Sequence, residues 1–246
     1  MIGKPEYPLQ YGQNLAVLGN GLTEQDSHEI NYFFNNTRAK KYLWYDTDKQ
    51  RLENNQNISL IESSGAEFGG TLQNFRSAAY LHDVGTLAIF NGRLKYFFKK
   101  TRHPFLITRG KAPYKEVIVS LNGYIPERLI ETGAEIASHF RISCRCVYVI
   151  PPGALKTGQD TQELEDRKNF VRDYENLTRT KIPLTVLEGN PVHKILSDIE
   201  KSPNSLLLLA ANSKDRISSL NPHASFLIAL RSENSVLVLP DEDINE

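Results

Sequence analysis

The sequence predicts an α/β fold made of two tandem open, parallel five-stranded sheets with helices on both faces. Short apolar runs alternate with segments of helical periodicity along the 246-residue chain, an order typical of βαβ units with right-handed crossovers. The run 205–211 is apolar without alternation, as in a central parallel strand buried on both faces. The first half repeats the order of the second. We therefore predict one domain over residues 1–110 and another over 111–246.

The second half is the more regular of the two. Its expected strands span 116–121, 144–150, 182–187, 205–211 and 236–239. A helix from about 125 to 140 separates the first two strands, and Pro126 suits its first turn because an N–H there has no helical partner. Asn190 is the expected cap of a later helix that Pro191 opens, and a final helix covers 224–231.

A long, charged helix is expected between the second and third of these strands. Asp160 and Glu163 have the spacing of a capping box, with Asp in place of Ser or Thr. The positions expected to face the sheet are Leu164, Phe170 or Val171, Tyr174 and Leu177. The pattern therefore predicts a helix that packs one apolar stripe against the strands.

The first half is predicted to be a shorter, degenerate copy of the second. Its expected strands span 15–18, 42–45, 58–61, 86–90 and 105–108. The residues with helical spacing are Ile30, Phe33 and Phe34 in one segment, Phe68, Leu72, Phe75 and Ala79 in a second, and Leu94, Phe97 and Phe98 in a third. The segment 46–57 is polar and holds no clear helix, which is why the copy is interpreted as degenerate.

Several features of the second half carry a family resemblance. It opens on Lys115-Glu116-Val117-Ile118-Val119, turns through Gly189-Asn190-Pro191 and ends on Ser235-Val236-Leu237-Val238-Leu239-Pro240. With the long charged helix after its second strand, it resembles the universal stress protein family over residues 115–240. The resemblance implies a Rossmann-like fold similar to the adenine-nucleotide α-hydrolases, and a role in stress response or regulation. Members with two fused copies are common, in accord with a degenerate first copy.

The resemblance also implies where a nucleotide binds in some members of the family. In those that bind ATP, an Asp ends the first strand and touches the nucleotide, whereas this sequence has Asn122 there and Asn20 in the first half. They cradle the phosphates with G-x-x-G-x(9)-G-S/T after the fourth strand, but residues 211–219 contain no glycine. Such a cradle needs a close backbone approach, often at a φ that glycine adopts most freely. We therefore expect a non-enzymatic protein without a cofactor, with ATP or AMP binding, or weak nucleotide hydrolysis, as the alternative.

A ligand cleft is expected at the carboxyl ends of the strands, where open α/β sheets bind their ligands. The candidate ligand-binding residues are Asn122, Gly123, Val149, Asn212, Ser213, Lys214, Arg216, Asn20 and Gly21. Asn-Gly is also ordinary turn chemistry. The segment 212–216 has Lys and Arg that suit an anion, and it is equally typical of a solvated loop. Both interpretations stay open from the sequence.

Composition bounds the partners and the location. The chain has 29 basic and 29 acidic residues, so its charge balance does not indicate nucleic acid. No apolar stretch approaches the roughly 18 residues of a membrane span. Its two cysteines, Cys144 and Cys146, fit a reducing compartment and are typical of buried structural thiols, with a redox or metal role as the alternative. We expect a cytoplasmic protein without a metal or catalytic site.

Local charge and the internal repeat bear on assembly. Residues 93–115 are basic with no acid among them, typical of a solvated helix face and linker, or of a site for an acidic protein partner or for the acidic tail 241–246. The predicted repeat indicates either a homodimer or an intramolecular pairing of the two halves.

Overall fold

The computed structural model describes residues 14–19, 40–45, 58–62, 77–82, 104–123, 125–153, 157–211 and 224–240. It also describes five single residues, all of them helical: Gln25, His28, Glu29, Tyr32 and Phe98.

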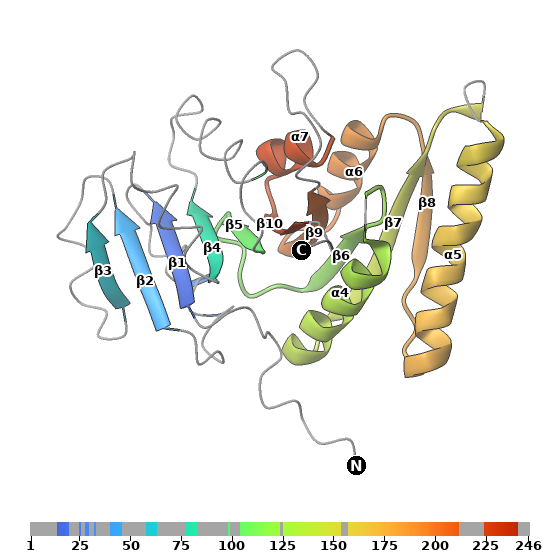
Figure 1. Ribbon diagram of the computed structural model, residues 1–246. Coiled ribbons are helices and arrows are strands. Elements are labelled where there is room, and N and C mark those ends of the chain that lie inside the picture. Colours follow the sequence, from blue (N-terminus) through green and yellow to red (C-terminus); the bar gives the residue numbers. More distant parts are fainter. Residues whose placement is uncertain are drawn as a thin grey trace, which may run out of the picture.

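The described strands form one ten-stranded sheet in the order β3-β2-β1-β4-β5-β10-β9-β6-β7-β8 (Figure 1). The strands are β1 (Asn14–Gly19), β2 (Lys40–Tyr45), β3 (Ile58–Glu62), β4 (Ser77–His82), β5 (Phe105–Thr108), β6 (Glu116–Ser120), β7 (Ser143–Ile150), β8 (Leu184–Glu188), β9 (Ser205–Ala211) and β10 (Ser235–Pro240). Neighbours are parallel within β1–β5 and within β6–β10. Both groups have the same internal order, so the α/β class is confirmed.

The two groups of strands meet at β5 and β10, which pair antiparallel. Ile107 lies opposite Val236, and Phe105 lies opposite Val238. The expectation of two separate sheets is corrected in this respect, because the last strand of each group joins them into one. An unpaired last strand would present free N–H and C=O groups at an edge. Here every residue of both strands is buried instead.

Four helices of the described part cover the two faces of β6–β10. Helices α4 (Pro126–Phe140) and α5 (Gly158–Thr178) lie on one face, and α6 (Pro191–Ile199) and α7 (Ala224–Arg231) lie on the other (Figure 1). This three-layer order is what βαβ connections between parallel strands produce. Pro126 stands in the first turn of α4, and Asn190 caps α6, as predicted.

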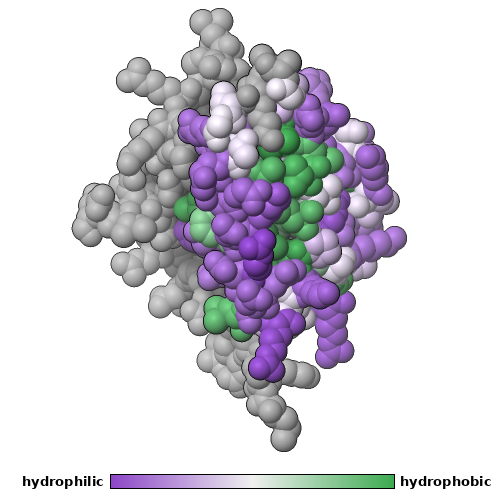
Figure 2. Space-filling view, turned by 90° about the vertical axis from the view of Figure 1, so that its right-hand side faces the viewer, coloured by the Kyte–Doolittle hydropathy of each residue, from purple (hydrophilic) through white to green (hydrophobic). Residues whose placement is uncertain are grey.

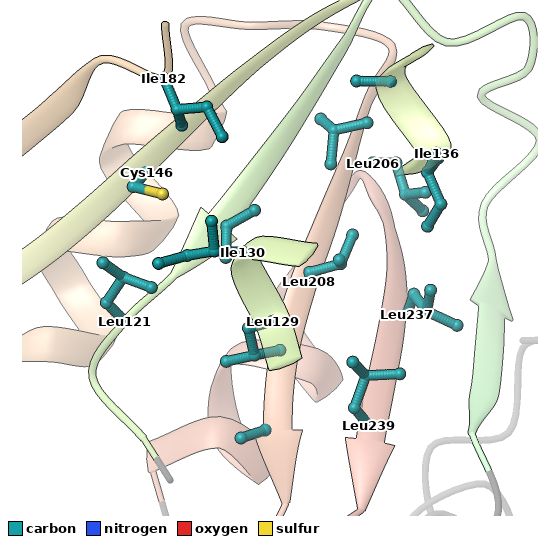
Figure 3. Close-up of a cluster of buried hydrophobic side chains, with 14 of the residues drawn as sticks. Leu121, Leu129, Ile130, Ile136, Cys146, Ile182, Leu206, Leu208, Leu237 and Leu239 are labelled. Atoms are coloured by element: carbon teal, nitrogen blue, oxygen red, sulfur yellow. The ribbon is translucent and has the colours of Figure 1, made fainter. Parts of the chain in front are cut away.

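The core divides between the two faces of the sheet. Leu206 and Leu208 of β9 point to the side of α4 and α5, whereas Leu207 and Leu209 point to the side of α6 and α7. Figure 3 shows the first cluster, in which Leu129 of α4 and Leu237 of β10 lie beside the leucines of β9. Strand β9 is buried along its whole length, which confirms its predicted central place.

The long helix α5 differs from its prediction at both ends. Thr157 is its N-cap, and Asp160 completes the capping box as the third helical residue, so the expected box of Asp160 and Glu163 is wrong. Leu164 and Val171 face the core, but Leu177 is 85% exposed. A helix of 21 residues is about 31 Å long and a five-residue strand only about 17 Å, so the last turn of α5 extends beyond β8.

The first half contains one clear error of interpretation. Ala79 belongs to strand β4, which pairs with β1 and β5, and not to a helix. The expected fourth strand at 86–90 and the expected helical residues Phe68, Leu72 and Phe75 lie outside the described residues. Phe98 is helical and buried, as its spacing predicted.

The face that carries β8 and α5 has an exposed hydrophobic area bordered by hydrophilic residues (Figure 2). Strand β8 is at one edge of the sheet, and its Val186 is 38% exposed. An apolar side chain on an edge strand is a position where another chain can pair or pack.

Candidate functional site

The topology places a crevice between the carboxyl ends of β6 and β9. The chain leaves β6 through α4 toward β7, and it leaves β9 through α7 toward β10, on the opposite side of the sheet. Adjacent strands whose connections diverge in this way form the switch point at which α/β sheets bind ligands. The predicted candidates Asn122 and Gly123 follow β6 and therefore lie at this point.

Gly123 brings the loop after β6 close to β9. A Cβ on this glycine would lie 3.2 Å from the Cβ of Ala210, near the carboxyl end of β9. The carbonyl of Gly123 accepts a hydrogen bond from Nη2 of Arg167 at 3.3 Å. The glycine therefore allows a close approach, and its backbone is fixed by a side chain from α5.

Asn122 is paired with the backbone of a neighbouring strand. Its Nδ2 donates to the carbonyl of Val149 at 2.6 Å, and its Oδ1 accepts from the N–H of Val149 at 2.7 Å. The side-chain amide thus acts as one more residue of the β6–β7 ladder, beyond the backbone bond from Leu121 N–H to the Val147 carbonyl at 2.9 Å. Of the predicted candidates, Asn122 and Val149 are brought together. The side-chain amide of Asn122 and the backbone groups of Val149 hydrogen-bond to each other instead of facing a ligand.

Arg167 of α5 is a charged group at this crevice that sequence reasoning missed. Its Nε is buried and has no hydrogen-bond partner among the described residues. Its guanidinium carbon lies 6.0 Å from the centre of the Phe170 ring. A buried guanidinium N–H without an acceptor is a donor available to an anion. The sequence does not single out Arg167, because α5 carries many other charged residues.

Two further side chains make hydrogen bonds near the carboxyl ends of β7 and β8. Glu188 accepts from the N–H of Gly153 at 2.7 Å, which ties the end of β8 to the loop after β7. The hydroxyl of Tyr148 donates to Glu163 of α5 at 3.3 Å. Burial, with the negative charge of Glu163, raises the pKa of Tyr148. This phenol therefore stays protonated at neutral pH and serves as a hydrogen-bond donor.

The remaining predicted site residues lie outside the described residues. They are Asn20 and Gly21 after β1, and Asn212, Ser213, Lys214 and Arg216 after β9. Their proposed role in binding an anion stays a prediction.

The two cysteines lie in β7 next to the core. Burial, with the charge of Glu116, raises the pKa of Cys144 to about 12, and burial also raises the pKa of Cys146. Both thiols are free and protonated at neutral pH, so they are poor nucleophiles. Within the described ranges, no cluster of His, Cys, Asp or Glu is suited to hold a metal ion.

A second polar cluster surrounds Glu29, far from this crevice. Its carboxylate is fully buried and contacts residues 109–111, Tyr114 and Ser235. Sequence reasoning missed it, because residues 29 and 235 are 206 positions apart and no spacing rule connects them. The basic segment 93–115 indicates a solvated face or a site for an acidic partner or the acidic tail, which does not predict Glu29.

Comparisons with known proteins address the fold. No protein-family model and no curated protein matches the sequence. Several solved structures are similar over nearly the whole chain, among them the following three. A protein assigned as a universal stress protein from Pseudomonas aeruginosa has a TM-score of 0.70 at 12% identity, covering 96% of this chain and 95% of that one. A universal stress protein from Archaeoglobus fulgidus has a TM-score of 0.65 at 12% identity, covering 95% and 98%.

The third structure is the cytoplasmic domain of a prokaryotic cation chloride cotransporter. Its TM-score is 0.55 at 14% identity, covering 93% of this chain and 95% of that domain. The chain therefore has an α/β fold of the universal stress protein type. None of the helices in the described part of the chain is long and apolar enough to cross a membrane.

Proposed function

We propose that this protein is a non-enzymatic, cytoplasmic regulatory protein of the universal stress type, without the nucleotide site of the ATP-binding members. The observation that carries the proposal is the pairing of Asn122 with Val149. The resemblance places a nucleotide-contacting Asp where this chain has Asn122. Here the side-chain amide of Asn122 binds both the N–H and the carbonyl of Val149. None of these groups is left to hydrogen-bond an adenine ring or a ribose. The absence of glycine from residues 211–219 supports the same conclusion.

A thermal-shift panel tests this proposal directly. The probes are ATP, ADP, AMP and cyclic AMP with Mg²⁺, each at millimolar concentration, on the wild type and on Asn122→Ala. We expect no stabilisation of the wild type and no release of phosphate from ATP. A ligand at 100 times its Kd adds about 2.7 kcal/mol, which corresponds to several degrees in Tm. A shift of that size in the wild type contradicts the proposal.

Asn122→Ala serves as the matched variant of the panel. The substitution frees the N–H and carbonyl of Val149 and lowers the free energy of unfolding by about 1–2 kcal/mol for the two lost hydrogen bonds. A nucleotide-dependent shift in the variant alone supports the role of Asn122 in closing the site. Equal, substantial shifts in both proteins show that Asn122 does not block nucleotide binding.

An anion-binding function is the second candidate, and Arg167 favours it. Its buried Nε lacks a partner within the described residues, and its Nη2 already lies beside the loop after β6. Inorganic phosphate or AMP would bind to this guanidinium, and Lys214 and Arg216, predicted from the sequence to bind an anion, belong to the same proposal. Isothermal titration with phosphate tests it, since Arg167→Ala abolishes binding if the arginine is the ligand. Absence of heat in the wild type removes this candidate.

The stress or regulatory role is proposed to act through assembly. The pairing of β5 with β10 uses one edge from each group of strands, so a homodimer formed through strand pairing has β3 and β8 as edges. The exposed Val186 favours β8. Among similar proteins, the fold also occurs as the cytoplasmic domain of a transporter, which supports a role as a binding module. Light scattering of the wild type and of Val186→Glu tests this, because only a β8 interface is disrupted by the substitution.

A further inference from the structure

The carboxylate of Glu29 accepts five hydrogen bonds although its residue is 0% exposed. Its Oε2 accepts from three successive backbone N–H groups, those of Arg109 at 3.1 Å, Gly110 at 2.6 Å and Lys111 at 3.3 Å. Its Oε1 accepts from the hydroxyls of Tyr114 and Ser235. All five donors are neutral groups. They replace water around a buried charge in the way that an oxyanion hole does.

The backbone at 109–111 has the form of an anion-binding nest. Gly110 has a φ of +65°, and successive N–H groups that flank a left-handed residue point to one concave side. A Cβ on Gly110 would lie 3.0 Å from the Cβ of Gln25, so a larger residue is disfavoured by space as well as by φ. Both the conformation and the close approach therefore require this glycine.

The donors are held in place by contacts that do not involve Glu29. The N–H of Arg109 also donates to Oγ of Ser235 at 3.0 Å. The guanidinium of Arg109 donates to the carbonyls of Ser232 at 3.0 Å and Ala229 at 3.3 Å, around the end of α7. The ring of Tyr114 packs edge-on against Phe140 of α4, with ring centres 6.2 Å apart. The donors are thus organised by α4, α7 and β10.

The acceptor comes from a distant part of the chain. Tyr32 follows Glu29 by three residues, so both lie on the same face of a helical turn. Tyr32 stacks on Phe140 with ring centres 4.5 Å apart and packs edge-on against Tyr114 at 5.6 Å. The carboxylate therefore enters its receptor beside an aromatic contact, and one turn of the first half docks on the second.

We propose that residues 109–111, Tyr114 and Ser235 form a carboxylate-binding site whose ligand is Glu29 of the same chain. The bound carboxylate locks the turn that contains Glu29 to the segment 109–114 and to β10. When the side chain is truncated, the same donors take a small free carboxylate such as formate or acetate. The site is separate from the crevice at Asn122, so it stands or falls independently of the proposed function.

Chemical rescue in the full chain tests the proposal. Glu29→Ala is expected to lower Tm by about 5–10 °C, because several hydrogen bonds to a charged acceptor are lost. Sodium formate should raise the Tm of this variant by about 3–5 °C relative to sodium chloride at equal ionic strength. The wild type should not respond, because Glu29 fills its site. Glu233→Ala, at an exposed loop position, is the control for loss of an acid and should behave as the wild type in both salts.

Glu29→Gln distinguishes a carboxylate receptor from a pocket that merely needs filling. The amide keeps the shape, and its oxygen can accept the three backbone N–H groups. Its NH₂ then faces the hydroxyls of Tyr114 and Ser235, which must act as acceptors instead of donors, so Tm should fall, though by less than in Glu29→Ala. This variant decides the matter if Glu29→Ala does not fold. A glutamine variant as stable as the wild type overturns the proposal. So does a folded Glu29→Ala that formate stabilises no more than it stabilises the wild type.

Discussion

Glu29 and Ser235 are hydrogen-bonded although 206 residues separate them in the chain. The hydroxyl of Ser235 accepts from the N–H of Arg109 and donates to the carboxylate of Glu29. It therefore hydrogen-bonds both to the segment that holds Glu29 and to Glu29 itself. Ser235 opens β10, the strand that pairs antiparallel with β5. The two groups of strands are therefore joined at one place by a backbone ladder and by a buried polar cluster beside it.

The Glu29–Ser235 contact should appear as a coupling energy. A double-mutant cycle of Glu29→Ala and Ser235→Ala, measured by urea unfolding, should give a coupling of about 1–3 kcal/mol, as for residues that share a hydrogen-bond network. Pairing Ser235→Ala with Glu165→Ala, at an exposed position of α5, is the control and should be additive within about 0.5 kcal/mol. Additivity of the first pair shows that the contact does not contribute to stability.

Gly133 is expected to be irreplaceable in α4. A Cβ there would lie 2.5 Å from Cγ2 of Val119 in β6. Gly133→Ala should therefore lower the free energy of unfolding by about 1–3 kcal/mol, despite the better helix propensity of alanine. Gly158→Ala in the first turn of α5 is the matched control, since a Cβ there meets nothing within 4 Å. It should be neutral or slightly stabilising, and equal effects at both positions would argue against this packing.

Asn190 should contribute to stability as the cap of α6. Its Oδ1 accepts from the N–H groups of Val192 at 3.0 Å and His193 at 3.3 Å. Asn190→Ala should cost about 1 kcal/mol in urea unfolding. Ser197→Ala, at an exposed position of the same helix, should change stability by less than about 0.5 kcal/mol. A cap variant no less stable than the control contradicts the assignment.

Stability should decline at alkaline pH because of the cysteines in β7. Burial, with the charge of Glu116, raises the pKa of Cys144 from 9.0 to about 12, and burial raises the pKa of Cys146 as well. Between these values the unfolded thiols release protons while the folded ones keep them, so the free energy of unfolding falls as pH rises. The stabilisation is complete below about pH 9.

Urea unfolding from about pH 8 to about pH 11 checks this pH dependence. The variant carrying Cys144→Ala and Cys146→Ala should lose less stability over that range than the wild type. Part of the decline should persist, since burial also raises the pKa of Tyr148 and Tyr174. Identical slopes in the two proteins would show that the thiols are not protected by the fold.

Much of the second half follows from local rules. Asn190 and Pro191 mark the start of α6 because a cap needs only residues within one turn of each other. The apolar run of β9 predicts a central strand because such a strand is buried on both faces. In the first half the same reasoning placed Ala79 on a helix, because spacing over a short apolar stretch fits both kinds of element.

The position of the candidate site was predictable from the sequence, but the hydrogen bonds of its residues were not. The end of β6 follows from the strand order, so Asn122 could be placed at the crevice from the sequence. That its amide binds both backbone groups of Val149 depends on the distance between β6 and β7, which no spacing in the sequence reports. The unpartnered Nε of Arg167 likewise depends on where α5 packs.

By itself, the sequence determined the α/β class, most elements of the second half and the missing glycines after β9, because these depend on side-chain periodicity and backbone chemistry over a few residues. Only the tertiary structure decided that β5 and β10 join the strands into one sheet. It also decided that Glu29 fills a nest at 109–111. Both contacts bring together groups distant in the chain, where burial leaves each polar group dependent on whichever partner the fold supplies.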